Sequence, residues 1–202
     1  MDATASLFLE GKVSRAYLKL SLPLVASMVV TLIYNLADTF FVAQTNNTAL
    51  VAGVSLGAPV FTFLMALGNI FGQGGSSLVS RMLGQGDRNG VKAASSFCFW
   101  ITILLGALIA ALMLAFLEPL LRILGASDET RGHARDYFIP LAAGAPFVML
   151  SFIHSNLLRS EGLSKESMAG TILGALVNII LDPLMISTMG MGARGAAIAT
   201  VI

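Results

Sequence analysis

The sequence predicts an all-α polytopic membrane protein, a bundle of six transmembrane helices whose sixth helix is incomplete. Hydrophobic residues make up 56% of the 202 positions and charged residues only 11%, against roughly 25% charged residues in soluble domains. Five apolar runs reach the length of about 20 residues that a helix needs to cross a bilayer. They cover approximately residues 20–42, 51–78, 93–117, 137–158 and 168–188, and a sixth begins at 195 and stops at 202. We therefore expect the chain to be the front part of a longer protein.

The first apolar run carries a carboxylate, Asp38, that no nearby Lys or Arg neutralises. An acidic side chain at the centre of a membrane helix costs about 2.5 kcal/mol or more. Four polar residues of this run lie within roughly 60° of one another around a helix: Ser27, Thr31, Tyr34 and Asp38. We expect this stripe, together with Asn35, to line a cavity. The alternative is a structural aspartate that is hydrogen-bonded to neighbouring helices.

The distribution of Lys and Arg predicts the orientation of the helices. The N-terminal segment and the loops on its side of the membrane hold eight basic residues, whereas the opposite loops hold four. The first group is Lys12, Arg15, Lys19, Arg81, Arg88, Lys92, Arg159 and Lys165, and the second is Arg122, Arg131, Arg135 and Arg194. The positive-inside rule then predicts a multi-pass protein of the cell (inner) membrane with a cytoplasmic N-terminus.

Of eleven acidic residues, only Asp38 and Asp182 fall within predicted spans. Counted at about 1.5 Å per residue, both lie roughly 5–10 Å below the outer surface, and Thr200 reaches a similar depth on the sixth helix. On the fifth run, Asn178 precedes Asp182 by one helical turn, and Thr171 shares the same face of the helix. We predict that this face looks into the bundle and that Thr171 lines the cavity.

Asp38, Asn178, Asp182 and Thr200 together offer two carboxylates, an amide oxygen and a hydroxyl. Oxygen ligands of this kind suit a hard cation such as Na⁺, or a shared proton. Two adjacent carboxylates cannot both stay ionised cheaply without a cation between them. The sequence thus predicts a proton-binding or sodium-binding pair. The alternative is that each aspartate bonds locally and that the two never meet.

Other chemistries have little support in the sequence. Cys98, His133 and His154 lie far apart and lack the spacing of zinc ligands. Residues 84–87 match the G-x-G-D motif of intramembrane aspartyl proteases, but Asp87 falls in a predicted cytoplasmic turn, so this function is a remote alternative. We expect no enzyme activity and no cofactor. A net charge of +1 without a basic block argues against a nucleic-acid partner.

Glycine spacing and one charged segment predict how the helices pack. Three G-x-x-x-G pairs, which let helix backbones approach closely in lipid, are Gly53 with Gly57, Gly68 with Gly72, and Gly170 with Gly174. Residues 118–136 carry mixed charges around an apolar LLRIL core, which predicts a short amphipathic helix at the outer membrane interface.

Five stretches in order along the chain resemble the multidrug and toxic compound extrusion (MATE) transporters. They are YNLADTFFV, SRMLGQGD, LRSEGLSKESM, NIILDPLMI and GARGAAIATVI. The resemblance implies a transporter of twelve helices in two six-helix lobes, with residues 1–202 forming most of the N-terminal lobe and a C-terminal lobe of the same chain as its partner. It also implies antiport, in which organic cations or drugs leave in exchange for H⁺ or Na⁺.

The resemblance further implies roles for individual residues. In the family, the acidic site of the N-terminal lobe combines an Asp late in the first helix with Asn, Asp and Thr from the fifth and sixth helices. These match Asp38, Asn178, Asp182 and Thr200. A proline early in the first helix, matched by Pro23, is associated with bending of that helix when the site is protonated.

Two other functions remain open at this point. One is a flippase for lipid-linked precursors, which belongs to the same superfamily and would need an arginine-rich cavity to hold pyrophosphate. The other is a structural or regulatory membrane subunit.

Overall fold

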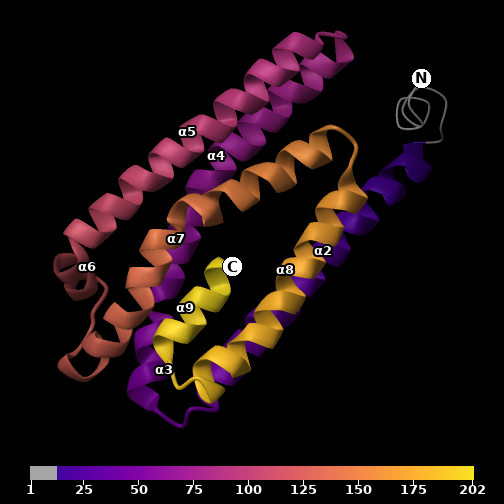
Figure 1. The fold of residues 1–202 in the computed structure, drawn as a ribbon. Helices are drawn as coiled ribbons and strands as arrows, with labels where there is room; N and C mark the ends of the chain where they lie inside the picture. Colours follow the sequence, from indigo (N-terminus) through magenta and orange to yellow (C-terminus); the bar gives the residue numbers. More distant parts are fainter. Residues whose placement is uncertain (1–12) are drawn as a thin grey trace.

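The computed structural model describes residues 13–202, and every regular element within that range is helical (Figure 1). The α-helices are α2 (Val13–Ala43), α3 (Thr48–Ser55), α4 (Gly57–Gly84), α5 (Arg88–Ala115), α6 (Leu117–Ile123), α7 (Asp128–Ser160), α8 (Ser164–Asp182) and α9 (Ala193–Val201), and a π-helix, η1 (Pro183–Thr188), continues α8. Lys12 lies outside the described residues, as do the side chains of Arg15 and Lys19.

Five stretches are long and apolar enough to cross a membrane, which confirms the prediction of an all-α polytopic membrane protein. They are Ser21–Ala43, Thr48–Gly84, Arg88–Ala115, Asp128–Ser160 and Ser164–Thr188. The second stretch is interrupted at Leu56, which separates α3 from α4. Pro59 explains the break, because it has no N–H to donate to the Ser55 carbonyl four residues earlier.

Helix α7 begins at Asp128, well before the apolar run that starts near residue 137, because polar residues stabilise its first turn. The Ser127 hydroxyl accepts a hydrogen bond from the Thr130 backbone N–H at 3.3 Å, and the Thr130 hydroxyl accepts one from the Ser127 N–H at 2.9 Å. This reciprocal pair is a capping box. The prediction of one amphipathic helix over 118–136 is therefore wrong in its second half. Only α6 is a separate helix there.

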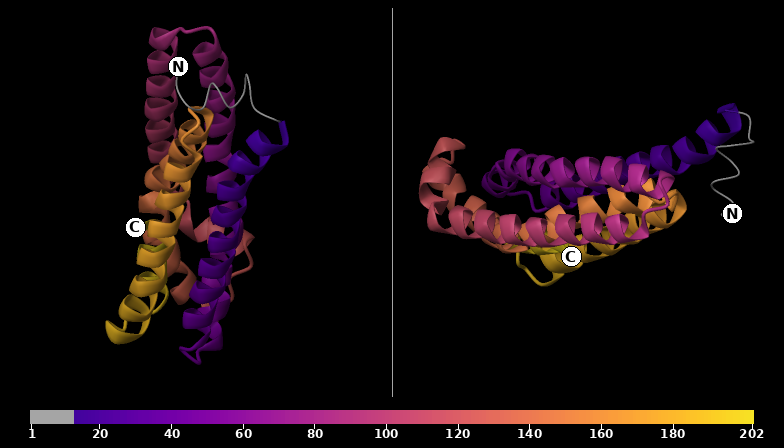
Figure 2. Two further views of the ribbon diagram at one scale, coloured as in Figure 1. Left: turned by 90° about the vertical axis from the view of Figure 1, so that its right-hand side faces the viewer. Right: turned by 90° about the horizontal axis from the view of Figure 1, so that it is seen from above.

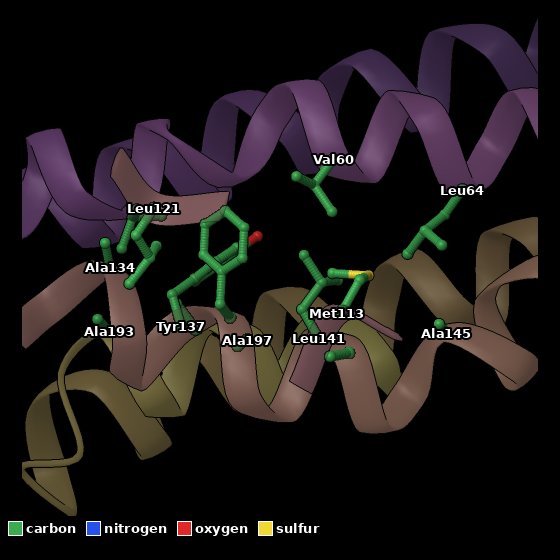
Figure 3. Packing of buried hydrophobic residues seen from close by; sticks show 14 of the residues in the cluster. Val60, Leu64, Met113, Leu121, Ala134, Tyr137, Leu141, Ala145, Ala193 and Ala197 are labelled. Atoms are coloured by element: carbon green, nitrogen blue, oxygen red, sulfur yellow. The ribbon is translucent and has the colours of Figure 1, made fainter. Parts of the chain in front are cut away.

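Helix α7 is the centre of the bundle and packs against α4, α5 and α9. Figure 3 shows Val60 and Leu64 of α4 pointing toward Leu141 of α7 and Met113 of α5. The apolar side chains in this region are buried, and both Leu64 and Leu141 have no exposed surface. This core fixes the position of α7 relative to the other helices.

Glycines allow α3 and α4 to approach α7 closely, as two of the three predicted pairs require. A Cβ atom at Gly68 would lie 2.9 Å from the Met149 carbonyl oxygen, and a Cβ at Gly57 would overlap the Tyr137 ring. The third pair, Gly170 and Gly174, has open space at the Cβ position, so the predicted close approach there is wrong within the described part of the chain.

Helix α2 runs along α8, and together they form a layer separate from α4 and α5 (Figures 1 and 2). The loops at 44–47 and 189–192 lie at one end of the bundle. The loops at 85–87 and 161–163 lie at the other, which we call the basic end because Arg81, Arg88 and Lys165 flank those loops. The second half of α7 leans across the bundle toward α8.

Candidate functional site

A cavity of about 250 Å³ lies among five helices, in the half of the bundle away from the basic end. Its walls come from α2, α3, α4, α7 and α9. Ser55 and Ala58 line it on either side of the interruption at Leu56. The break in the second span is therefore part of the cavity wall.

Helix α2 supplies the acidic wall of the cavity. Asp38 lines it together with Tyr34, Asn35 and Thr39. Asp38 lies five residues before the end of α2 at Ala43, which corresponds to a depth of about 8 Å along the helix. The structure thus brings three of the sequence-predicted residues, Tyr34, Asn35 and Asp38, onto the same cavity.

Asn178 and Asp182 lie on the buried face of α8, and neither lines the cavity itself. Asp182 has no exposed surface, and Asn178 is 6% exposed. Asp38 lies on α2 and Asp182 on α8, two helices that run side by side. Only Asp38 lines the cavity.

Five buried polar atoms of these three residues have no hydrogen-bond partner in the part of the chain that the structure describes. They are one carboxylate oxygen of Asp38, both of Asp182, and the amide oxygen and nitrogen of Asn178. Buried polar groups in proteins are nearly always paired, and an ionised carboxylate without a partner is especially costly. A proton or cation would relieve this cost, because it would neutralise charge or accept oxygen ligands.

Thr200 lines the cavity from α9, and its hydroxyl donates to the Ala196 carbonyl at 2.9 Å. Helix α9 lies close to α7 because Gly144 leaves room for the Val201 side chain, which a Cβ would overlap. This contact holds the last turn of α9, with Thr200, against α7. The hydroxyl oxygen keeps acceptor capacity for a further ligand.

Tyr137, which the sequence did not indicate as a site residue, lines the cavity from α7, as Thr200 does from α9. Its ring packs against Gly57 at the start of α4. Its place in the cavity depends on this contact with a glycine eighty residues earlier, which no local sequence pattern indicates.

The structure does not bring the predicted cavity residues Ser27, Thr31 and Thr171 to this cavity. Their hydroxyls instead donate to carbonyl groups one turn earlier on their own helices, at 2.9 to 3.1 Å. Pro23 is buried within α2, and its carbonyl accepts the hydrogen bond from Ser27. Pro23 has no N–H to donate, so the carbonyl of residue 19 lacks the usual helical partner.

The cavity is suited to positively charged ligands. Its polar lining consists of a carboxylate, hydroxyls and an amide, and among the side chains that the structure describes no Lys, Arg or His belongs to it. Tyr34, Phe61 and Tyr137 add aromatic surface, which attracts cations through the negative face of the ring. The chain is thus a bundle with five apolar helical stretches, each long enough to cross a membrane, around a partly polar cavity that carries a carboxylate.

Comparison with known proteins identifies the family. The MatE protein-family model matches residues 23–184. The chain belongs to the MATE family, as its sequence motifs predict. The multidrug export protein MepA of Staphylococcus haemolyticus (strain JCSC1435) is 34% identical over 195 residues, which cover 96% of this chain and 43% of MepA.

Two solved structures share the fold over the whole chain. One is a MOP superfamily transporter from Pyrococcus furiosus, for which the reverse polarity of the binding pocket was taken to suggest a different function. The other is a multidrug resistance MATE family transporter in an outward-facing conformation. Each has a TM-score of 0.91, is 34% identical, and is covered over 44% of its length. The chain thus spans less than half the length of these relatives, which agrees with one lobe of a two-lobe transporter.

Proposed function

We propose that the chain forms the N-terminal lobe of a secondary antiporter that exports organic cations or drugs in exchange for H⁺ or Na⁺. In this proposal the C-terminal lobe completes the transport pathway, the N-terminus is cytoplasmic, and the protein lies in the inner membrane. The lobe binds and releases ions and substrates and catalyses no covalent reaction.

The observation that carries the proposal is the set of unpartnered oxygens on Asp38, Asn178 and Asp182. Two buried carboxylates in a low-dielectric bundle repel each other and lack hydrogen-bond donors. Binding one proton or one Na⁺ removes most of that cost. Thr200, on the adjacent wall, offers one more oxygen ligand. The coupling ion would therefore bind at the Asp38/Asp182 pair.

The same site also provides the coupling between ion and substrate. An organic cation in the cavity is stabilised by the negative charge of Asp38 and by the rings of Tyr34 and Tyr137. When H⁺ or Na⁺ neutralises the acidic pair from the outside, this attraction falls and the substrate dissociates outward. Two ligands that lower each other's affinity in this way are thermodynamically coupled.

Pro23 supplies a hinge for the accompanying change in α2. Proline removes one helical hydrogen bond, and a helix bends most readily at such a position. Pro23 lies four residues before Ser27 and on the same side of α2, and the hydroxyl of Ser27 bonds to its carbonyl. Neutralising Asp38 would change how α2 packs against α8, and Pro23 would absorb the bend.

Substrate polarity has to be inferred from this chain's own residues, because the pocket of the Pyrococcus furiosus relative was described as having reverse polarity. In this chain the cavity carries Asp38 and includes no basic side chain in its lining. A cavity that binds the pyrophosphate of a lipid-linked precursor would need arginines. Organic cations are therefore the substrates we propose, ahead of the flippase alternative.

The test is transport by the full-length protein in vesicles that contain a fluorescent organic cation such as ethidium. Efflux is driven separately by a proton gradient and by a sodium gradient. We expect one gradient to drive efflux, and both Asp38→Asn and Asp182→Asn to abolish it, because an amide cannot exchange a proton or hold Na⁺ as a carboxylate does. Asp136→Asn, at an exposed position of α7, should transport normally.

Efflux at the wild-type rate from either the Asp38→Asn or the Asp182→Asn variant would refute the paired-aspartate site. If neither gradient drove efflux by the unaltered protein, antiport itself would be refuted. Protein yield and helix content measured in parallel exclude a folding defect as the cause of lost transport.

A further inference from the structure

A second cavity, of about 260 Å³, lies between α5 and α7 at the basic end of the bundle. It shares no lining residue with the acidic cavity. Ser95 lies seven residues into α5, and His154 lies six residues before the end of α7. At about 1.5 Å per residue, the cavity extends roughly 10 Å from the end of the helices, a depth that spans the lipid head groups and the first part of the acyl chains.

The cavity exists because α7 separates from α5 toward the basic end. At Gly106 the two helices touch, since a Cβ there would lie 2.6 Å from the Cα of Pro146. Pro146 removes a helical hydrogen bond and allows α7 to bend, and Figure 1 shows α7 leaning away from α5 beyond this region. Two turns later the gap is bridged by side chains, with the Phe99 and His154 ring centroids 6.1 Å apart.

The polar groups of this cavity are mainly hydrogen-bond acceptors. The His154 Nδ1 lies 3.0 Å from the Leu150 carbonyl oxygen, so Nδ1 carries the proton and Nε2 of the neutral ring is an acceptor. Glu161 contributes a carboxylate, and among the described side chains it forms no ion pair. Ser95 adds a hydroxyl, and no Lys or Arg with a described side chain lines the cavity. Such a set of groups recognises a ligand that donates several N–H bonds and carries positive charge.

The remaining walls are apolar. Ile153, Leu157 and Leu158 of α7 line the cavity beside Phe99 of α5. An apolar surface next to a carboxylate at the depth of the lipid head groups fits a molecule with a charged head and a hydrocarbon body.

We propose that this cavity binds the primary ammonium head of an amphiphile, with Glu161 and the Nε2 of His154 accepting its N–H bonds and Ile153, Leu157 and Leu158 contacting its hydrocarbon part. Two sources can supply this chemistry. One is a membrane lipid with an ethanolamine head group, and the other is a cationic amphiphilic drug in the cytoplasmic leaflet. The site is independent of the acidic cavity, so it can be tested without any transport measurement.

The only tryptophan of this chain lies next to Phe99, a residue that lines the cavity. Trp100 is exposed and adjacent to Phe99, with ring centroids 5.4 Å apart. The full-length protein is reconstituted into phosphatidylcholine bilayers containing lipids brominated in the acyl chain, which quench tryptophan on contact. Brominated phosphatidylethanolamine and brominated phosphatidylcholine are compared at equal mole fractions, and Trp100→Phe identifies the signal that comes from this position.

The choline head of phosphatidylcholine carries the same positive charge as ethanolamine but has no N–H donor. We therefore expect phosphatidylethanolamine to be preferred about threefold, as one net hydrogen bond to the carboxylate would provide, and Glu161→Gln to remove the preference. The Glu161 backbone N–H donates to the Leu157 carbonyl, so the substitution leaves the end of α7 intact. Glu166→Gln, an exposed acid at the same end of the bundle, is the matched control and should retain the preference.

A second experiment distinguishes the two sources. Dodecylamine and dodecyltrimethylammonium are titrated into the same bilayers. Displacement of brominated lipid by dodecylamine alone, dependent on Glu161, supports the primary ammonium site and shows that soluble amphiphiles reach it. A lipid preference without displacement supports the site with lipid as its ligand. If Glu161→Gln leaves the binding of both phosphatidylethanolamine and dodecylamine unchanged, the proposal is wrong.

Discussion

Replacing Gly68 by alanine tests whether the close approach of α4 to α7 holds the bundle together. The added Cβ would lie 2.9 Å from the Met149 carbonyl oxygen and 3.2 Å from its Cα, whereas ordinary contacts begin at 3.4 Å. Both neighbours are backbone atoms, so the helices must separate by about 0.5 Å. Overpacking of this kind costs about 1–3 kcal/mol.

The matched control is Gly74→Ala in the same helix, where nothing lies within 4 Å of the added Cβ. Both variants gain the same helix propensity, about 1 kcal/mol, so this contribution cancels in their difference. The free energy of unfolding, measured by SDS titration of the purified protein in mixed micelles with circular dichroism, should be about 1–3 kcal/mol lower for Gly68→Ala. If Gly68→Ala is as stable as Gly74→Ala, close backbone packing at this point does not stabilise the bundle.

Three further predictions follow from individual contacts. Pro23→Ala restores a helical N–H in α2 and should slow substrate turnover more than it weakens substrate binding in vesicles; unchanged turnover would rule out the hinge. Ser127→Ala removes the capping bond from the Thr130 N–H and should lower the free energy of unfolding by about 1 kcal/mol. Ser127→Asp is the control, because its carboxylate can accept the same bond, and it should keep the free energy of unfolding unchanged. Gly57→Ala pushes the Tyr137 ring out of place and should weaken binding of organic cations measured by equilibrium dialysis; equal affinity in the variant would show that Tyr137 does not contact the substrate.

The membrane spans and the buried acids could be predicted because a helix in lipid needs about 20 apolar residues and because an acidic side chain in such a run is costly and therefore rare. Apolar length identified the five spanning stretches. Asp38 and Asp182 stood out as the only acids within the predicted spans, and the spacing of Asn178 and Asp182 by one helical turn predicted that both lie on one face of α8, where both are buried.

Features that depend on contacts between distant segments could not be predicted in this way. Tyr137 belongs to the cavity because Gly57, eighty residues earlier, leaves space for its ring. The hydroxyls of Ser27 and Thr31 follow the predicted stripe but bond to their own helix, an outcome that helical spacing alone cannot distinguish from lining a cavity. Gly170 and Gly174 have G-x-x-x-G spacing, yet no helix in the described part of the chain approaches them.

The π-helix η1 begins at the residue after Asp182 and contains more residues per turn than α8. At its end, the Met189 N–H donates to the Leu184 carbonyl, five residues earlier, at 2.8 Å. A π-turn accommodates one residue more than an α-turn, so deleting one residue in 183–188 can return the segment to α-helical geometry while the side chains beyond it keep their direction. The same deletion in the regular part of α8 would rotate the following side chains by about 100° and turn the buried Asp182 away from its present surroundings. A one-residue deletion should therefore be tolerated better in 183–188 than in 168–177.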